Sequence, residues 1–195
     1  MKKLYCFDFD GTLTKKDTMF LFLQFYNCKK FTKEFIKHIP LFVFLKLKLM
    51  EAEKVKRNFI ASVLEGERQE ALETAAQRFF DKYYPGLIRE NALDFISTMD
   101  RTKTESLLVT ASLDIWVKPF ADQFGMTLLA TQAEFKDGIF TGRFVSPNCN
   151  GPEKVLRIKT ATAGKKFDKT IAFGDTDSDQ PMLEWADEGH LAFFE

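Results

Sequence analysis

Five short runs of apolar, strand-forming residues recur along the chain, with helical stretches between them. The runs are KLYCFD at 3–8, ESLLVT at 105–110, MTLLAT at 126–131, KTIAFGD at 169–175 and HLAFF at 190–194. Strands that alternate with helices are typical of a parallel sheet, because a parallel pair of strands needs a long crossover connection. The sequence therefore predicts an α/β protein built on a doubly wound parallel sheet.

One long interval interrupts this alternation. No convincing strand is present between Thr14 and Pro85. Apolar residues recur there at helical spacing, as in Phe31, Phe35 and Ile39 and again in Val55, Phe59 and Val63. We therefore predict an all-helical cap domain over residues 15–85, inserted between two parts of a core domain that comprises residues 1–14 and 86–195.

Turn-forming residues divide these regions further. Pro40 should break or start a helix, and Gly66 and Pro85–Gly86 mark turns. In the stretch AEFKDGIFTGRFV at 133–145, an Asp–Gly pair lies between alternating apolar residues. This pattern predicts a small β-hairpin.

Charge and composition exclude some function classes. The chain has 28 basic and 28 acidic residues, so net charge gives no reason to expect a nucleic-acid partner. Its three cysteines form no CxxC pair, and the amino terminus lacks the apolar run of a secretory signal, so we expect a cytoplasmic protein. The longest apolar run near the amino terminus, residues 39–45, is far shorter than the roughly 20 residues that a membrane-spanning helix needs.

Carboxylates follow the ends of two predicted strands. Asp8 ends the first strand with Asp10 just beyond it, and the stretch GDTDSD supplies Asp175 and Asp179. Because ligands of a doubly wound sheet bind outside the carboxyl ends of its strands, these side chains should converge there. Crowded carboxylates repel one another unless a cation is present, and oxygen ligands select a hard ion such as Mg²⁺. The sequence therefore predicts a Mg²⁺ site that receives a phosphate ester, which a carboxylate could attack.

Phosphate also needs hydrogen-bond donors and positive charge. The run LLVTAS ends with Thr110, Ala111 and Ser112, so a hydroxyl and backbone N–H groups could meet phosphate oxygens there. Pro152 at a first helical position would place Lys154 in the opening turn of a helix. An ammonium beside a helix amino terminus suits a phosphoryl dianion.

These motifs, in this order, resemble those of the haloacid dehalogenase superfamily of phosphotransferases. FDFDGT at 7–12 is similar to its first motif, DxDGT, and VTAS at 109–112 to its second. Lys154 is placed like the third motif, and GDTDSD at 174–179 is similar to the fourth, GDxxxD. A helical insertion directly after the first motif resembles the cap of subclass I. Together with GDTDSD, it resembles subfamily IB, which contains phosphoserine phosphatase.

The resemblance implies a role for each matching residue. Asp8 would be the nucleophile that forms an aspartyl phosphate, and Asp10 the general acid and base. Mg²⁺ would be bound by Asp8, the backbone carbonyl of Asp10, and Asp175, with Asp179 in or next to its shell. Phosphate would be held by Gly11, Thr12, Thr110, Ala111 and Lys154. Dehalogenases of the superfamily lack an acid at the position of Asp10, so the resemblance implies a phosphatase that acts on a small phosphomonoester or a lipid phosphate.

The sequence does not decide between several possible substrates. In phosphoserine phosphatases an acid after the first motif and a cap arginine bind the amino acid, for which Asp17 and Arg57 are the candidates here. The cap sequences TMFLFLQFY and FIKHIPLFVFLKLKLM resemble, more weakly, relatives of phosphatidylglycerophosphate phosphatase. Residues 29–57 hold nine Lys or Arg against three Glu, and a basic, aromatic surface would suit peripheral contact with an anionic membrane. Alternatively, the aromatic residues fill the core of the cap and the lysines form its solvated face.

Two alternatives to a hydrolase also remain. One is a non-catalytic phosphate-binding or partner-binding module that retains the fold. The other is phosphoryl transfer to an alcohol instead of water, because the same aspartyl phosphate can react with either acceptor. The sequence leaves the oligomeric state open.

Overall fold

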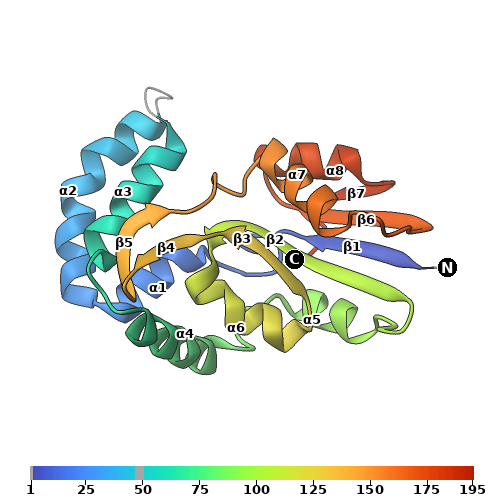
Figure 1. Ribbon diagram of the computed structural model, residues 1–195, viewed down its shortest axis with the longest axis horizontal. Helices are drawn as coiled ribbons and strands as arrows, with labels where there is room; N and C mark the ends of the chain where they lie inside the picture. Colours follow the sequence, from blue (N-terminus) through green and yellow to red (C-terminus); the bar gives the residue numbers. More distant parts are fainter. Residues whose placement is uncertain (1, 47–50) are drawn as a thin grey trace.

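A five-stranded parallel sheet forms the centre of the molecule. The computed structural model describes residues 2–46 and 51–195. The strands are β1 (Lys3–Phe7), β2 (Thr104–Leu113), β3 (Thr127–Thr131), β6 (Lys169–Gly174) and β7 (Glu188–Leu191), in the spatial order β3-β2-β1-β6-β7 (Figure 1). All neighbouring pairs are parallel. This confirms the predicted α/β fold class.

Each face of the sheet is covered by its own helices because both faces carry apolar side chains. Leu4 and Cys6 of β1 point to the face covered by α7 (Pro152–Ala161) and α8 (Gln180–Trp185). Phe7 belongs to the other face, covered by α5 (Glu90–Ser97) and α6 (Asp114–Phe124). Since the two sides of β1 are both buried, the strand is fixed at the centre and its carboxyl end has a defined position.

The last strand differs from its prediction. We predicted a strand over residues 190–194, but β7 begins at Glu188 and ends at Leu191. Ala192 then adopts a positive φ of 51°, which turns the chain. Phe194 packs its ring 5.1 Å from that of Phe173, so this phenylalanine fills the core instead of extending the strand.

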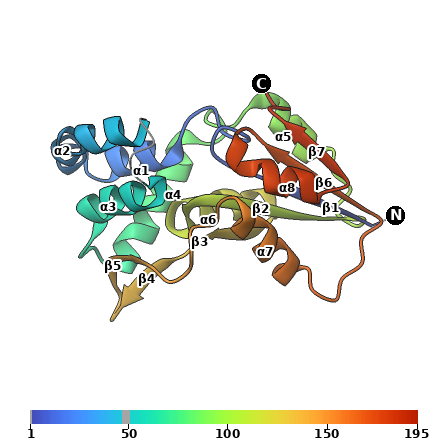
Figure 2. The ribbon, with the colours of Figure 1, turned by 90° about the horizontal axis from the view of Figure 1, so that it is seen from above.

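Within the described residues between β1 and α5 the structure has four helices and no strand, and the sequence predicts a helical region there. They are α1 (Thr18–Tyr26), α2 (Cys28–Lys46), α3 (Ala52–Leu64) and α4 (Gln69–Tyr83), gathered at one end of the molecule (Figures 1 and 2). Phe22 of α1 lies between Phe79 of α4 and Trp116 of α6, with ring centroids 5.5 and 5.2 Å away. These contacts join the helical region to the core. The division at residues 14 and 85 into two domains stays a prediction.

The described aromatic side chains of α2 fill the interior of the helical region. The rings of Phe31 and Phe35 lie 5.7 and 6.1 Å from that of Phe59 on α3. Val55, Phe59 and Val63 of α3 are all buried, as their spacing predicts. Of the two readings of the cap aromatics, the structure therefore supports the core for Phe31 and Phe35. Residues 47–50, at the end of the same basic and apolar stretch, lie outside the described residues.

Pro40 lies inside α2, so the prediction that it breaks or starts a helix is wrong. An internal proline cannot donate a hydrogen bond to the carbonyl four residues before it, here that of Ile36, and its ring crowds that carbonyl, yet α2 continues through Pro40. Ile36 is 60% exposed and Pro40 is also exposed, so the proline lies on the solvent side of the helix. Among residues 2–46 and 51–195, none of the helices is long and apolar enough to span a lipid bilayer.

The predicted hairpin is present and packs against the helical region. It consists of β4 (Ala133–Lys136) and β5 (Ile139–Phe144), joined by Asp137 and Gly138, which both have positive φ. Backbone hydrogen bonds of 3.0 and 2.9 Å connect Phe140 with Gly66 and Glu67, in the turn between α3 and α4. The hairpin therefore packs against α3 and the turn that follows it (Figure 1).

Candidate active site

The carboxylate of Asp8 lies at the carboxyl end of β1 and is almost fully buried. Its backbone N–H still bonds the carbonyl of Phe173 at 2.9 Å, so the sheet fixes its position. The ammonium of Lys154 donates to Oδ1 at 2.6 Å, and the hydroxyl of Thr12 lies 2.9 Å from Oδ2. Lys154 and Thr12 therefore orient the two oxygens of the Asp8 carboxylate.

Lys154 is in the first turn of α7, where the sequence predicts it. Its side chain is buried, and its ammonium donates to Asp8 and, at 2.5 Å, to Asp179. Although burial alone would lower the pKa of Lys154, the two carboxylates raise it above its ordinary value. Lys154 is therefore a permanent cation that uses two of its three N–H donors on the protein.

The loop after β6 holds the other two acids. Asp179 accepts hydrogen bonds of 3.2 Å from the backbone N–H groups of Asp175 and Thr176 on Oδ2, and Lys154 bonds Oδ1. Burial opposes ionisation of Asp179, but the Lys154 ammonium and these donors hold its pKa below the usual range. A Cβ on Gly174 would lie 2.4 Å from the Cβ of Asp179, so only glycine lets the loop close this tightly.

Asp8, Asp175 and Asp179 form a group that fits a hard divalent cation. One oxygen from each carboxylate can be chosen so that all three lie within 4.8 Å of one another. Burial raises the pKa of Asp8 to about 7, against the opposing effect of Lys154. Burial also raises the pKa of Asp175. The three acids outnumber the one lysine, so the group keeps a net negative charge. Its ligand atoms are all oxygens, which are the donors that Mg²⁺ prefers.

The carboxylate of Asp10 lies outside that group and joins the core to the first helix of the predicted cap. Oδ1 accepts the backbone N–H of Thr18 at 2.6 Å, and Oδ2 accepts the hydroxyl of Ser112 at 2.5 Å. Trp116 donates to the Thr18 hydroxyl at 3.1 Å and so fixes the start of α1. Asp10 is thus held beside the cavity by two donors from different parts of the fold.

Gly11 and Thr12 lie behind the carboxylates. Gly11 has a φ of +83°, and a Cβ there would lie 2.1 Å from Oδ2 of Asp175, so glycine is needed for both reasons. The Thr12 hydroxyl lies 2.9 Å from Asp8 and 3.2 Å from Asp175, and donates to one of them at a time. Neither residue lines the cavity, and both contact the acids; their part in phosphate binding stays a prediction.

These side chains surround a small cavity of about 110 Å³. Of the predicted residues, the lining includes Asp8, Asp10, Asp17, Thr110, Ala111, Lys154, Asp175 and Asp179. The other lining residues, Lys56, Asn150, Thr176 and Ser178, are not among the predicted ones. Asp177, which the motif leaves variable, is exposed and absent from the lining.

Of the two residues predicted to select the substrate, Asp17 lines the cavity and Arg57 does not. Asp17 lines the cavity but also caps α1, because its Oδ1 accepts the backbone N–H groups of Met19 and Phe20. Arg57 does not line the cavity. Its neighbour Lys56 does, and donates to the carbonyl of Ala111 at 3.3 Å. In the sequence, the excess of basic residues over 29–57 is the only feature that could have pointed to Lys56 as a site residue.

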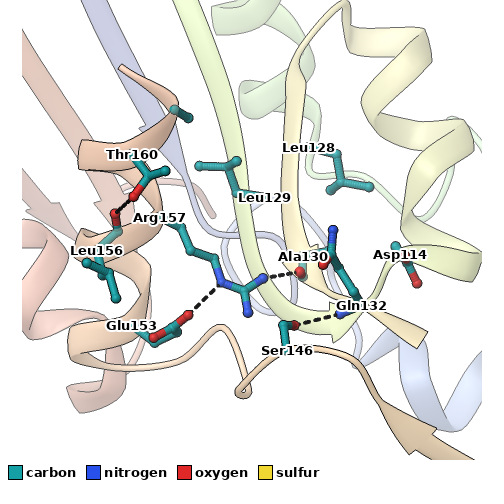
Figure 3. A pocket seen from close by; sticks show the side chains of 11 residues that line it. Asp114, Leu128, Leu129, Ala130, Gln132, Ser146, Glu153, Leu156, Arg157 and Thr160 are labelled. Atoms are coloured by element: carbon teal, nitrogen blue, oxygen red, sulfur yellow. Dashed lines mark hydrogen bonds and ion pairs between the residues drawn. The ribbon is translucent and has the colours of Figure 1, made fainter. Parts of the chain in front are cut away.

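A larger hollow of about 520 Å³ lies between α7 and β3, and none of the predicted site residues lines it (Figure 3). Arg157 crosses it from α7, with its side chain donating to Glu153 at 2.9 Å and to the carbonyl of Ala130. It also donates to the carbonyl of Pro147 at 2.5 Å. These bonds attach α7 to β3 and the following loop, and so hold the helix that carries Lys154.

Comparison with solved structures supports the fold. A protein of unknown function from Bordetella pertussis Tohama I matches with a TM-score of 0.85 and 22% identity, over 98% of this chain and 89% of that one. A phosphoserine phosphohydrolase-like protein from Francisella tularensis matches with a TM-score of 0.67 and 21% identity, over 98% and 86% of the two chains. At these identities the similarity is one of fold.

Comparison of sequences gives the family. Protein CicA of Caulobacter vibrioides is 32% identical over 193 residues, which are 98% of this chain and 86% of that protein. The model of the family described as haloacid dehalogenase-like hydrolase matches residues 6–184, which include every predicted motif. The chain therefore belongs to the haloacid dehalogenase-like hydrolase family.

Proposed function

We propose that this protein is a Mg²⁺-dependent phosphatase that hydrolyses phosphomonoesters through an aspartyl phosphate on Asp8. The observation that carries the proposal is the environment of Asp8. Its carboxylate borders the cavity, is oriented by Lys154 and Thr12, and lies within a group of three acids. Structural neighbours that are phosphoserine phosphatases, and a cytosolic 5'-nucleotidase, support the same reaction class.

The acids fit Mg²⁺, which would be held by Asp8, Asp175 and Asp179. When bound, the ion would neutralise the charge that accumulates on the phosphoryl oxygens. Lys154 contributes a second, fixed positive charge from inside the protein. Because its ammonium is already bonded to Asp8, it lies where the phosphoryl group must approach the nucleophile.

In the first half-reaction a carboxylate oxygen of Asp8 attacks phosphorus, and the bond between phosphorus and the ester oxygen breaks. Asp10 gives its proton to the departing alkoxide. In the second half-reaction Asp10 takes a proton from water, the water oxygen attacks phosphorus, and the bond to Asp8 breaks to release phosphate. The two donors on Asp10, Thr18 and Ser112, keep its carboxyl at one position through both steps.

The size and charge of the cavity indicate the substrate class. The cavity of about 110 Å³ is lined mostly by charged and polar side chains, which suits a phosphoryl group. The alcohol part of the ester must then lie towards the helical region, where Asp17 and Lys56 present one charge of each sign. We infer a small polar phosphomonoester or the exposed head of a lipid phosphate, with phosphoserine as one candidate.

The test is phosphate release from a panel of esters, with and without Mg²⁺. The panel contains phosphoserine, sugar phosphates, nucleotides and phosphatidylglycerophosphate in mixed micelles. Asp8→Asn is the inactive variant, and Asp177→Asn is its matched control, because Asp177 belongs to the same acidic motif but lies outside the cavity. We expect turnover that requires Mg²⁺, disappears in Asp8→Asn and persists in Asp177→Asn.

A covalent intermediate is tested separately. Labelled phosphate from the substrate should remain on acid-quenched wild-type protein, be released by hydroxylamine, and be absent from Asp8→Asn. Turnover that survives in Asp8→Asn would refute the assignment of the nucleophile. A folded, Mg²⁺-loaded protein that releases no phosphate from any ester would favour the binding-module alternative.

A further inference from the structure

The outward face of α2 carries exposed apolar side chains. Ile36 and Ile39 are 60% and 45% exposed, and Pro40 beside them is also exposed. Positions separated by three or four residues lie on one side of a helix, so these side chains form a continuous apolar strip. Figures 1 and 2 both show α2 at the end of the molecule furthest from β7 and α8, with this helix at the outside.

Lysines accompany this strip. Lys29, Lys33 and Lys37 are exposed and follow one another at intervals of four residues, so they form a row along the same side of the helix. Glu34 is the only acid in residues 28–41, and it is paired with Lys37 at 2.6 Å. Within residues 2–46 and 51–195, Lys29 and Lys33 form no ion pair.

The opposite face of α2 is fully used by the fold. Phe31, Phe35 and His38 direct their rings to Phe59 of α3, and Phe35 also contacts Phe20 of α1. The two isoleucines are not part of the hydrophobic core that these rings help to form. What sets this face apart is the combination of an apolar strip with a row of lysines on an outer helix.

We propose that the outer face of α2, formed by Lys29, Lys33, Ile36, Lys37 and Ile39, docks the protein on an anionic lipid bilayer. Aliphatic side chains beside a row of lysines suit the boundary between acyl chains and negatively charged headgroups. A protein partner is less well matched, since protein interfaces are enriched in aromatic residues and arginine and depleted in lysine. The proposal is independent of the phosphatase reaction.

The test is flotation of the full-length protein with phosphatidylcholine vesicles, with and without phosphatidylglycerol. One variant combines Lys29→Gln with Lys33→Gln, and a second combines Ile36→Gln with Ile39→Gln. The matched control combines Leu156→Gln with Lys159→Gln on α7, since Leu156 is 58% exposed and Lys159 is exposed. Because every substituted side chain is exposed, circular dichroism should show that all variants fold.

We expect binding that requires the anionic lipid and falls as salt rises. Removing two lysines should weaken it roughly 30-fold, the isoleucine variant should also bind more weakly, and the α7 control should bind like wild type. Equal binding to neutral vesicles, no binding to either, or unchanged binding in both α2 variants would overturn the proposal. Self-association in sedimentation velocity that only the isoleucine variant abolishes would instead assign the face to a second copy. The vesicle lipids are phosphodiesters and no phosphomonoester is present, so this result and the test of the phosphatase are independent.

Discussion

Replacement of Gly11 by alanine is a sharp test of how the carboxylate group is assembled. An ideal Cβ at this position would lie 2.1 Å from Oδ2 of Asp175, whereas real contacts under 3.0 Å are essentially never seen. The Asp175 carboxylate would have to move, and its hydrogen bond with Thr12 would be disturbed. The substitution therefore acts on a proposed Mg²⁺ ligand without changing any acid.

Two effects of Gly11→Ala can be separated in magnitude. A φ of +83° costs a residue with a Cβ about 1–2 kcal/mol in the free energy of unfolding. Displacement of Asp175 should in addition weaken Mg²⁺ binding by roughly 10- to 100-fold, the loss typical when the support of a metal ligand is removed. The first effect arises from the backbone and the second from the site.

Gly66→Ala is the matched control for the backbone effect. Gly66 has a φ of +88°, but a Cβ there would meet no atom within 4 Å. Urea unfolding should show similar losses of stability in both variants, while titration calorimetry should show weaker Mg²⁺ binding only in Gly11→Ala. If Gly11→Ala binds Mg²⁺ as tightly as Gly66→Ala, then Asp175 is not a ligand of the ion and the proposed site is wrong.

Two further predictions concern the charges at the site. Lys154→Met should lower the free energy of unfolding by about 3–5 kcal/mol, because Asp8 and Asp179 would be left buried without their cation; a loss below about 1 kcal/mol in urea unfolding would contradict the buried ion pairs. The affinity for Mg²⁺ should rise up to about tenfold per pH unit and level off above pH 7, because the pKa of Asp8 is raised to about 7 and the ion must displace its proton below that pH. Calorimetry in buffers of different ionisation enthalpy should count that released proton at pH 6, and an affinity independent of pH between 5 and 7 would refute the assignment.

Much of the site could be predicted because its residues are attached to local structure. Asp8 follows a strand, Asp175 follows another, and Lys154 follows a helix start marked by Pro152. The carboxyl ends of neighbouring parallel strands meet at one edge, so the spacing along the chain translates directly into proximity. The pairing of β1 with both β2 and β6 then brings acids 167 residues apart, Asp8 and Asp175, into one group.

The contribution of the helical region could not be predicted in the same way. Helical periodicity shows that Val55 and Phe59 face inward, but it does not show how α3 is rotated over the core. Adjacent helical residues point about 100° apart, which is why Lys56 reaches the cavity and Arg57 does not. Likewise, α2 continues through Pro40, because whether a helix accepts an internal proline depends on its surroundings in the fold as well as on the proline itself.

The segment from Thr110 to Ser112 links the chemistry to the position of the helical region. The hydroxyl of Ser112 and the first N–H of α1, from Thr18, both bond the carboxylate of Asp10. Between Thr110 and Ser112, the backbone carbonyl of Ala111 accepts a hydrogen bond from the ammonium of Lys56 on α3. Residues of the core and of the helical region line the cavity together, so a movement of the helices would change the site. If α1 and α3 moved away together, the bonds of Thr18 and Lys56 would break and Asp10 would keep only Ser112. The acid and base of the proposed reaction is therefore fully positioned only when the helices cover the site, which is also when water is excluded from the nucleophile.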